Sequence, residues 1–192
     1  MKRIVTPFFV ILLMSAKMVL GQVGIFSDHQ DVGSTAKPGS VNFDAAKGEY
    51  LIAGGGENIW ATNDAFHYAW TKMSGDLTLA ANIQWPGTNG NPHRKACLMI
   101  RQSLDANSAY VDVADHGVGL TALQYRETDG AATHEVQLNV SAPERVRIEK
   151  HGDYVSMSFA MAGEELQPAG AMYKLQLKEP FYVGLAVCAH DN

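Results

Sequence analysis

Residues 145–160 read RVRIEKHGDYVSMSFA, and this stretch decides the fold. In its first half Val146 and Ile148 alternate with charged neighbours. Because successive side chains of a β-strand point to opposite faces, this period of two is typical of a strand that is buried on one face only. The turn residues at 151–153 then precede a second run of the same kind. The stretch therefore predicts a β-hairpin.

Runs with the same strand character recur along the chain, and helical periodicity is almost absent. A second hairpin is predicted over 40–53. We expect strands over 40–45, 49–53, 66–72, 77–85, 96–102, 109–114, 119–126, 134–140, 145–150, 154–160, 172–177 and 181–189. About a dozen short strands joined by Gly-, Asn- and Asp-containing turns fit an all-β fold, a two-sheet antiparallel β-sandwich of the jelly-roll type.

The first 21 residues have the pattern of a signal peptide. Lys2 and Arg3 precede an apolar stretch at 4–14, and Gly21 offers a small residue for cleavage before Gln22. An uncleaved membrane anchor is the alternative, but the apolar stretch is too short to span a bilayer. We therefore expect an extracytoplasmic protein whose mature chain, 22–192, forms a single domain and does not insert into the membrane.

Charge narrows the range of partners. The full chain has a formal net charge of -5, and loss of the three basic residues within 1–21 brings it to -8. An acidic chain with scattered basic residues argues against a nucleic-acid or anionic-membrane partner.

Two cysteines, Cys97 and Cys188, each lie in an apolar run. An exported protein can form disulfides, yet a buried free cysteine also behaves as a small hydrophobic residue. Sequence alone leaves both alternatives open.

Signatures of catalysis are missing from the sequence. A retaining glycoside hydrolase of this fold needs two close carboxylates, for which we expect Glu-x-Asp-x-x-Glu on one strand, and the chain has no such run. Neither a Gly-x-Ser-x-Gly motif nor paired zinc-binding histidines occur. No cofactor is evident, although a structural calcium ion is possible at oxygen ligands drawn from Asp28, Asp31, Asp64 and Asp191.

A sugar-binding surface needs an aromatic platform and planar polar side chains. Alternation places Gln124 and Arg126 on one face of their strand, and Arg101 shares a face with Met99. For both arginines, a structural ion pair is the alternative to ligand contact.

Four further candidates lie in or beside a glycine-rich phrase and at the end of the last strand. Trp60 and Asp64 precede the strand that carries His67, and His190 follows the last apolar run. Trp60 could stack on a ligand or close the end of the sandwich. His190 could act in binding or simply be hydrogen-bonded at a strand end.

Several phrases carry a family resemblance: 54–68 with the turn at 74–76, then 97–105, 124–126 and 181–191. In this order they resemble concanavalin A-like, laminin-G-like domains of the DUF1349 type, which precede TolB-like propeller repeats in exported bacterial proteins. In that family one further strand follows the phrase around His190, so the domain would lack its last strand. Many relatives also carry a tryptophan near 143–150, which is absent here.

The resemblance implies a noncatalytic recognition module with a glycan or sugar ligand, or with a propeller domain or envelope protein as partner. Together with the signal peptide, it implies a periplasmic or secreted bacterial protein. The alternatives are a sugar hydrolase similar to DUF1080 domains, using Asp64, His67 or His190, and a structural docking domain. A groove at Trp60 and Arg126 would favour binding, an acid against His67 would favour chemistry, and buried, ion-paired arginines without a groove would favour docking.

Overall fold

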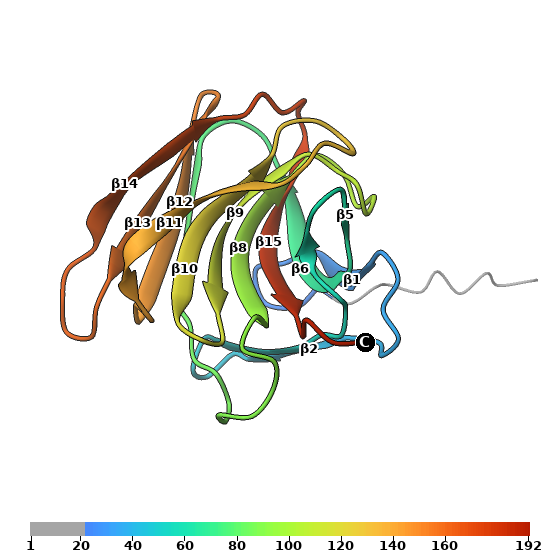
Figure 1. Ribbon diagram of the computed structural model, residues 1–192, viewed down its shortest axis with the longest axis vertical. Coiled ribbons are helices and arrows are strands. Elements are labelled where there is room, and N and C mark those ends of the chain that lie inside the picture. The colour runs from blue at the N-terminus through green and yellow to red at the C-terminus, as the bar shows by residue number, and fades with distance from the viewer. Residues whose placement is uncertain (1–21) are drawn as a thin grey trace, which may run out of the picture.

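The computed structural model describes residues 22–192, so the predicted signal peptide lies outside the described residues. The described chain is all-β (Figure 1), and every strand pairing is antiparallel. Seven strands form the larger sheet, in the order β1 (Asp28–Val32), β6 (Phe66–Met73), β15 (Phe181–Cys188), β8 (Lys95–Arg101), β9 (Tyr110–His116), β10 (Leu120–Arg126) and β11 (His134–Ser141). Four form the smaller sheet, in the order β14 (Gln167–Lys174), β13 (Tyr154–Ala160), β12 (Arg145–His151) and β7 (Leu77–Asn82).

Two short ladders complete the fold, β2 (Ser40–Asp44) with β3 (Glu49–Ala53) and β4 (Ile59–Trp60) with β5 (Asn63–Asp64). The predicted all-β antiparallel sandwich is confirmed. Both predicted hairpins are confirmed as well, since β2 pairs with β3 and β12 pairs with β13 in register.

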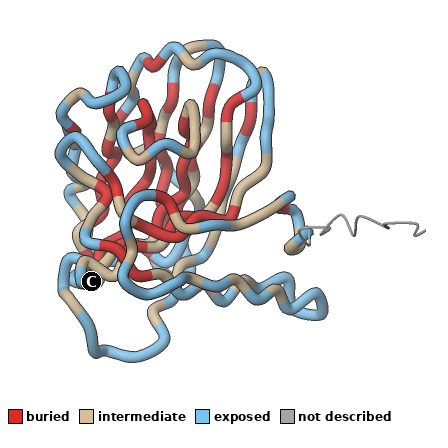
Figure 2. The backbone as a smooth tube through the Cα atoms, turned by 90° about the vertical axis from the view of Figure 1, so that its right-hand side faces the viewer, coloured by how far each residue is buried: buried red, intermediate tan, exposed pale blue. Residues whose placement is uncertain are grey.

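The main core lies between the two sheets. It is built by alternate residues, such as Leu98 and Val113 from the larger sheet and Ile148 from the smaller one. In Figure 2 the buried stretches, drawn in red, run along the stacked strands. Each such apolar side chain contributes roughly 1.5–3 kcal/mol when it leaves water.

A second cluster covers the other face of the seven-stranded sheet, which we call the outer face. Met99, Tyr110 and Ala114 project there, because they alternate with the residues that enter the main core. Ile59 of β4 packs in the same cluster. As a result β9, an interior strand of the sheet, is buried along its whole length.

Several strand predictions differ from the structure. The strand expected over 77–85 ends at Asn82, and β4 and β5 were not expected. The strand expected over 172–177 instead runs from Gln167 to Lys174, at the edge of the smaller sheet. Pro168 and Gly170 look like turn residues, but an edge strand tolerates a residue that cannot donate a backbone hydrogen bond. β1 was not expected, because its sequence DHQDV is polar. None of the residues 22–192 lies in a helix long and apolar enough to cross a bilayer.

Candidate functional site

The segment over 54–65 crosses the outer face and carries Trp60. Its glycines are required by close approach of the backbone. A Cβ on Gly56 would lie 1.9 Å from the carbonyl oxygen of Ala65, and Gly56 has a φ of 106°. Ala61, in the turn between β4 and β5, adopts a left-handed φ of 52°, which costs energy for any residue with a side chain.

A buried ion pair holds this segment on the sheet. Asp64 accepts two hydrogen bonds from Arg126, 2.8 Å from Nη1 to Oδ2 and 2.7 Å from Nη2 to Oδ1. Arg101 Nη1 lies 3.5 Å from the same Oδ2. None of the three side chains has exposed surface. Burial raises the pKa of Asp64, while the hydrogen bond from Arg126 and the charge of Arg101 oppose that shift.

The remaining donors of the two arginines hold backbone carbonyls of several loops. Arg101 donates to Ser103 and Asp105. Arg126 reaches the carbonyl oxygens of Trp60, Ala61, Ala106, Ser108 and Ala131. Both guanidinium groups therefore position the chain around Trp60 and have no surface to offer a ligand in this conformation.

A row of polar side chains lies on the outer face beside Trp60. Lys95 Nζ donates to the carbonyl oxygen of Ile59 at 2.7 Å and to Gln124 Oε1 at 3.1 Å, and it lies 5.2 Å from the centre of the Trp60 ring. Gln124 Nε2 in turn donates to Glu135 Oε2 at 3.1 Å. Lys95 and Gln124 are both buried. Gln124 thus links a buried cation to a partly exposed carboxylate.

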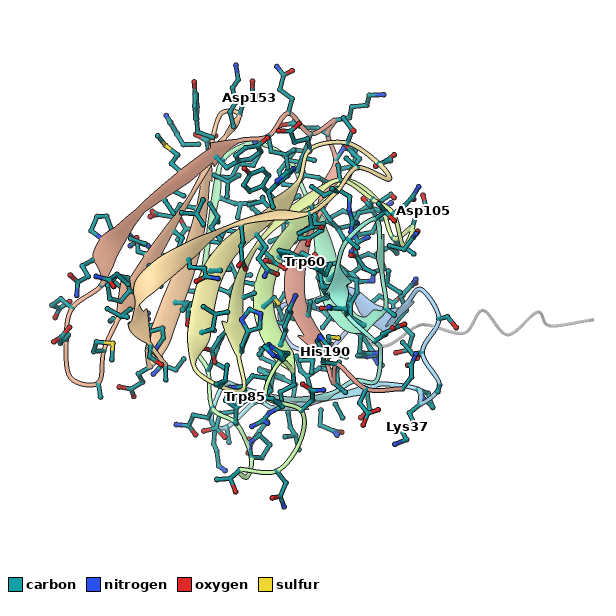
Figure 3. All side chains as sticks on the ribbon, in the orientation of Figure 1. Lys37, Trp60, Trp85, Asp105, Asp153 and His190 are labelled. Carbon is teal, nitrogen blue, oxygen red and sulfur yellow. The ribbon has the colours of Figure 1, made fainter. Side chains whose placement is uncertain are left out.

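Trp60 also lines a pocket of about 560 Å³. Its lining combines an aromatic ring with amide, imidazole and carboxylate groups, from Trp60, Asn58, Asn63, His190 and Glu57. Figure 3 shows Trp60 and His190 in this part of the molecule. A second hollow, of about 390 Å³ beside Asp76 and His151, has no tryptophan, tyrosine or phenylalanine in its lining. The first pocket is therefore the better ligand site.

Neighbouring groups fix His190. Its φ is 55°, its carbonyl oxygen accepts from Asn91 Nδ2 at 3.0 Å, and its Nε2 lies 3.2 Å from Asn58 Nδ2. The amide nitrogen Asn58 Nδ2 can only donate, so His190 Nε2 is the acceptor in this hydrogen bond. Asn58 Oδ1 already accepts from the amide of Ile59, which holds the amide in this orientation. Left-handed residues other than glycine often mark binding sites, and His190 and Ala61 both line this pocket.

His67 does not line the pocket beside Trp60. It projects from the face of β6 opposite to Phe66 and Tyr68. Its Nδ1 is 2.6 Å from Asp31 Oδ1, and its Nε2 is 3.0 Å from His29 Nδ1. The side chain is only 2% exposed. Gly39 covers it so closely that a Cβ there would lie 2.1 Å from the ring. Asp31 is thus an acid beside His67, but a substrate has almost no access to the buried ring.

The structure thus divides the seven candidate residues. The pocket lining contains Trp60, Asp64 and His190. Gln124 lies in the polar row, Arg101 and Arg126 lie in the buried ion pair, and His67 is separate. Alternation correctly placed Gln124 and Arg126 on one face.

Sequence reasoning missed three residues of this region, Asn58, Lys95 and Asp112. Lys95 and Asp112 could have been found, because each charged residue stands in phase with apolar residues of its strand. Asn58 gives no comparable signal.

The structure also bears on cysteines and metals. Cys97 and Cys188 are both free and buried, and burial raises the pKa of the Cys188 thiol to about 11. Within residues 22–192 no group of three or more His, Cys, Asp or Glu side chains is arranged to hold a metal ion. Two of the candidate calcium ligands, Asp31 and Asp64, instead accept hydrogen bonds from N–H groups.

Comparisons with known proteins add no relative. No protein-family model, no curated protein and no solved structure matches this chain.

Proposed function

We propose that this chain is an exported, noncatalytic recognition module that binds a glycan in the pocket beside Trp60. The observation that carries the proposal is the lining of that pocket. A partly exposed indole ring lies next to planar amide and imidazole groups, which are the two elements that a sugar ring and its hydroxyl groups require. This combination also agrees with the concanavalin-like, jelly-roll class that the sequence resembles.

The fixed geometry of the pocket supports binding over a purely structural role. The buried ion pair of Asp64 with Arg126 anchors the segment that carries Trp60, and Asn58 orients His190. A site held in place before the ligand arrives loses less entropy on binding. The left-handed residues Ala61 and His190 fit the same view, because local strain is commonly retained at binding sites.

A docking domain for a propeller or envelope protein is the second candidate. The complete burial of Arg101 and Arg126 favours it, since ligand contact by these side chains would require exposure. The pocket at Trp60 weighs against it. A hydrolase using His67 is less well supported, because the Asp31–His67 contact is covered by Gly39.

A glycan array tests the proposal. We expect selective binding by the wild-type protein and its loss in Trp60→Ala. The matched control is Tyr154→Ala, which removes an aromatic ring that is 48% exposed and does not line the pocket. Silence of the folded wild-type protein across the array would overturn the glycan proposal and favour the docking domain.

A further inference from the structure

The lining of the pocket beside Trp60 is uneven in charge. It contains two acidic residues, Glu57 and Asp64, and neither a lysine nor an arginine. The Asp64 side chain is fully buried in its ion pair with Arg126, so its charge is already compensated. Glu57 is exposed, and none of the ion pairs formed among residues 22–192 includes it. A ligand that enters the pocket therefore meets a single free carboxylate.

The backbone on both sides of Glu57 is held in place. The carbonyl oxygen of Gly56 accepts a hydrogen bond from the amide of Asp191 at 3.2 Å. The carbonyl oxygen of Asn58 accepts one from the amide of Ala65 at 2.7 Å. The Glu57 side chain thus extends from a segment of fixed position, which keeps its carboxylate within reach of the pocket.

The basic residues of this region do not pair with Glu57. Lys95 is only 3% exposed and donates its hydrogen bonds to other protein groups. The backbone of Lys37 approaches Gly55, but its side chain does not line the pocket. In Figure 3 Lys37 lies at the edge of the molecule, apart from Trp60. The accessible charge in the lining is therefore negative.

We infer that the pocket selects an amino sugar, and that Glu57 pairs with the ammonium group of that sugar while Trp60 contacts the ring. This inference rests on the proposed function and names the class of glycan that the site takes. An ammonium group is attracted by a carboxylate and donates hydrogen bonds to its oxygens. A sugar that carries a carboxylate or sulfate group is instead repelled by Glu57. The net charge of the chain, -5, acts in the same direction.

Three tetrasaccharides isolate the contribution of the amine. All have the same β-1,4-linked glucose backbone and differ at carbon 2, which carries an amine in the glucosamine tetramer, an acetamide in the N-acetylglucosamine tetramer and a hydroxyl in cellotetraose. Calorimetry at pH 6, where the amine is protonated, measures binding of each one by wild type, Glu57→Gln and Glu165→Gln. Glu165 is the matched control, because it is also exposed and does not line the pocket. Its substitution removes the same charge from the acidic chain.

We expect wild type to bind the glucosamine tetramer at least about threefold more tightly than the other two, as for an exposed ion pair. Glu57→Gln should lose this preference and still bind cellotetraose, whereas Glu165→Gln should keep it. Added salt should reduce the preference of wild type, since exposed charges are screened. The unfolding temperature of Glu57→Gln should match that of wild type, because the carboxylate pairs with no basic side chain of the described chain.

The inference is overturned if wild type binds the glucosamine tetramer no more tightly than the other two. A preference that Glu57→Gln retains, or that Glu165→Gln loses to the same extent, would also overturn it. In each of these cases, cellotetraose binding that disappears in Trp60→Ala would leave the proposed function standing. If no tetrasaccharide and no glycan on the array binds the wild-type protein, both proposals fail together.

Discussion

Asp64 and Arg126 face each other through two hydrogen bonds, of 2.8 Å and 2.7 Å, and neither side chain reaches the surface. Asp64 belongs to β5 and Arg126 to the end of β10, so the pair fixes the short β4–β5 ladder to the large sheet. Trp60 belongs to that ladder. The position of the pocket therefore depends on an ion pair whose side chains have no exposed surface.

Replacing Arg126 by Met should leave Asp64 without its main partner in the interior. Removal of one member of a buried ion pair typically costs about 3–5 kcal/mol of unfolding free energy. The control is Arg147→Met, which breaks a partly exposed pair with Glu149 and should cost less than about 1 kcal/mol. Urea denaturation measures both values. Equal losses in the two variants would contradict a structural role for the Asp64–Arg126 pair.

Gly56→Ala should destabilise the fold more than Gly48→Ala. Both glycines have positive φ values, 106° and 70°, so both substitutions introduce backbone strain. A Cβ on Gly56 would also meet the carbonyl oxygen of Ala65 at 1.9 Å, whereas one on Gly48 meets nothing within 4 Å. We expect an additional loss of about 1–3 kcal/mol at position 56, which differential scanning calorimetry can measure. Equal stabilities of the two variants would contradict the close approach of Gly56 to the Ala65 carbonyl oxygen.

The pKa of Asp112 predicts a specific pH dependence. Burial raises it from 3.8 to about 7, so between these values the folded protein holds a proton that the unfolded chain has lost. The contribution of Asp112 to stability therefore falls as pH rises from about 4 to about 7. Asp112→Asn removes this loss, and its stability advantage over wild type should grow across that range, to at most about 4 kcal/mol.

Urea denaturation of wild type and Asp112→Asn at pH 4, 5.5 and 7.5 tests this dependence. The comparison also cancels titration of His116, whose pKa burial lowers to about 4 in both proteins. An Asp112→Asn variant that is less stable than wild type at pH 7.5 would show that the carboxylate has a stabilising partner.

Both cysteines should be unreactive in the folded protein. Burial raises the thiol pKa of Cys97 and of Cys188 and removes both from solvent. Without reductant, an alkylating reagent should add nothing under native conditions and two groups in denaturant, as read by intact mass. A protein that takes no label even in denaturant would instead contain a disulfide.

Periodicity predicted most strands because their two faces meet different surroundings. The 145–160 hairpin and the direction of Gln124 followed from alternation alone. β1 was missed because this edge strand has few apolar residues. The predicted start of β14 was too late in the sequence, because Pro168 and Gly170 are typical turn residues. The sequence indicates the local chemistry of a strand, but it does not indicate whether that strand lies at the edge or in the middle of a sheet.

The site was harder to predict for a related reason. Alternation states which face Arg126 occupies, but it does not state that β4 and β5 cover that face and bury the guanidinium group. Trp60 and His190 are 130 residues apart in the numbering and line one pocket only because the chain folds back across the sheet. Contacts between residues so far apart produce no regular spacing in the sequence from which they could be predicted.

The most direct test of glycan binding beside Trp60 is nuclear magnetic resonance of the tryptophan indole N–H groups during titration with neutral oligosaccharides. The protein has three tryptophans, and only Trp60 lines the pocket. Trp85 donates its indole N–H to Asp115 and provides an internal control. We predict a saturable shift of the Trp60 signal while the Trp85 signal stays in place. A Trp60 signal that no sugar moves, or a shift confined to Trp85, would contradict the assignment of this pocket as the binding site.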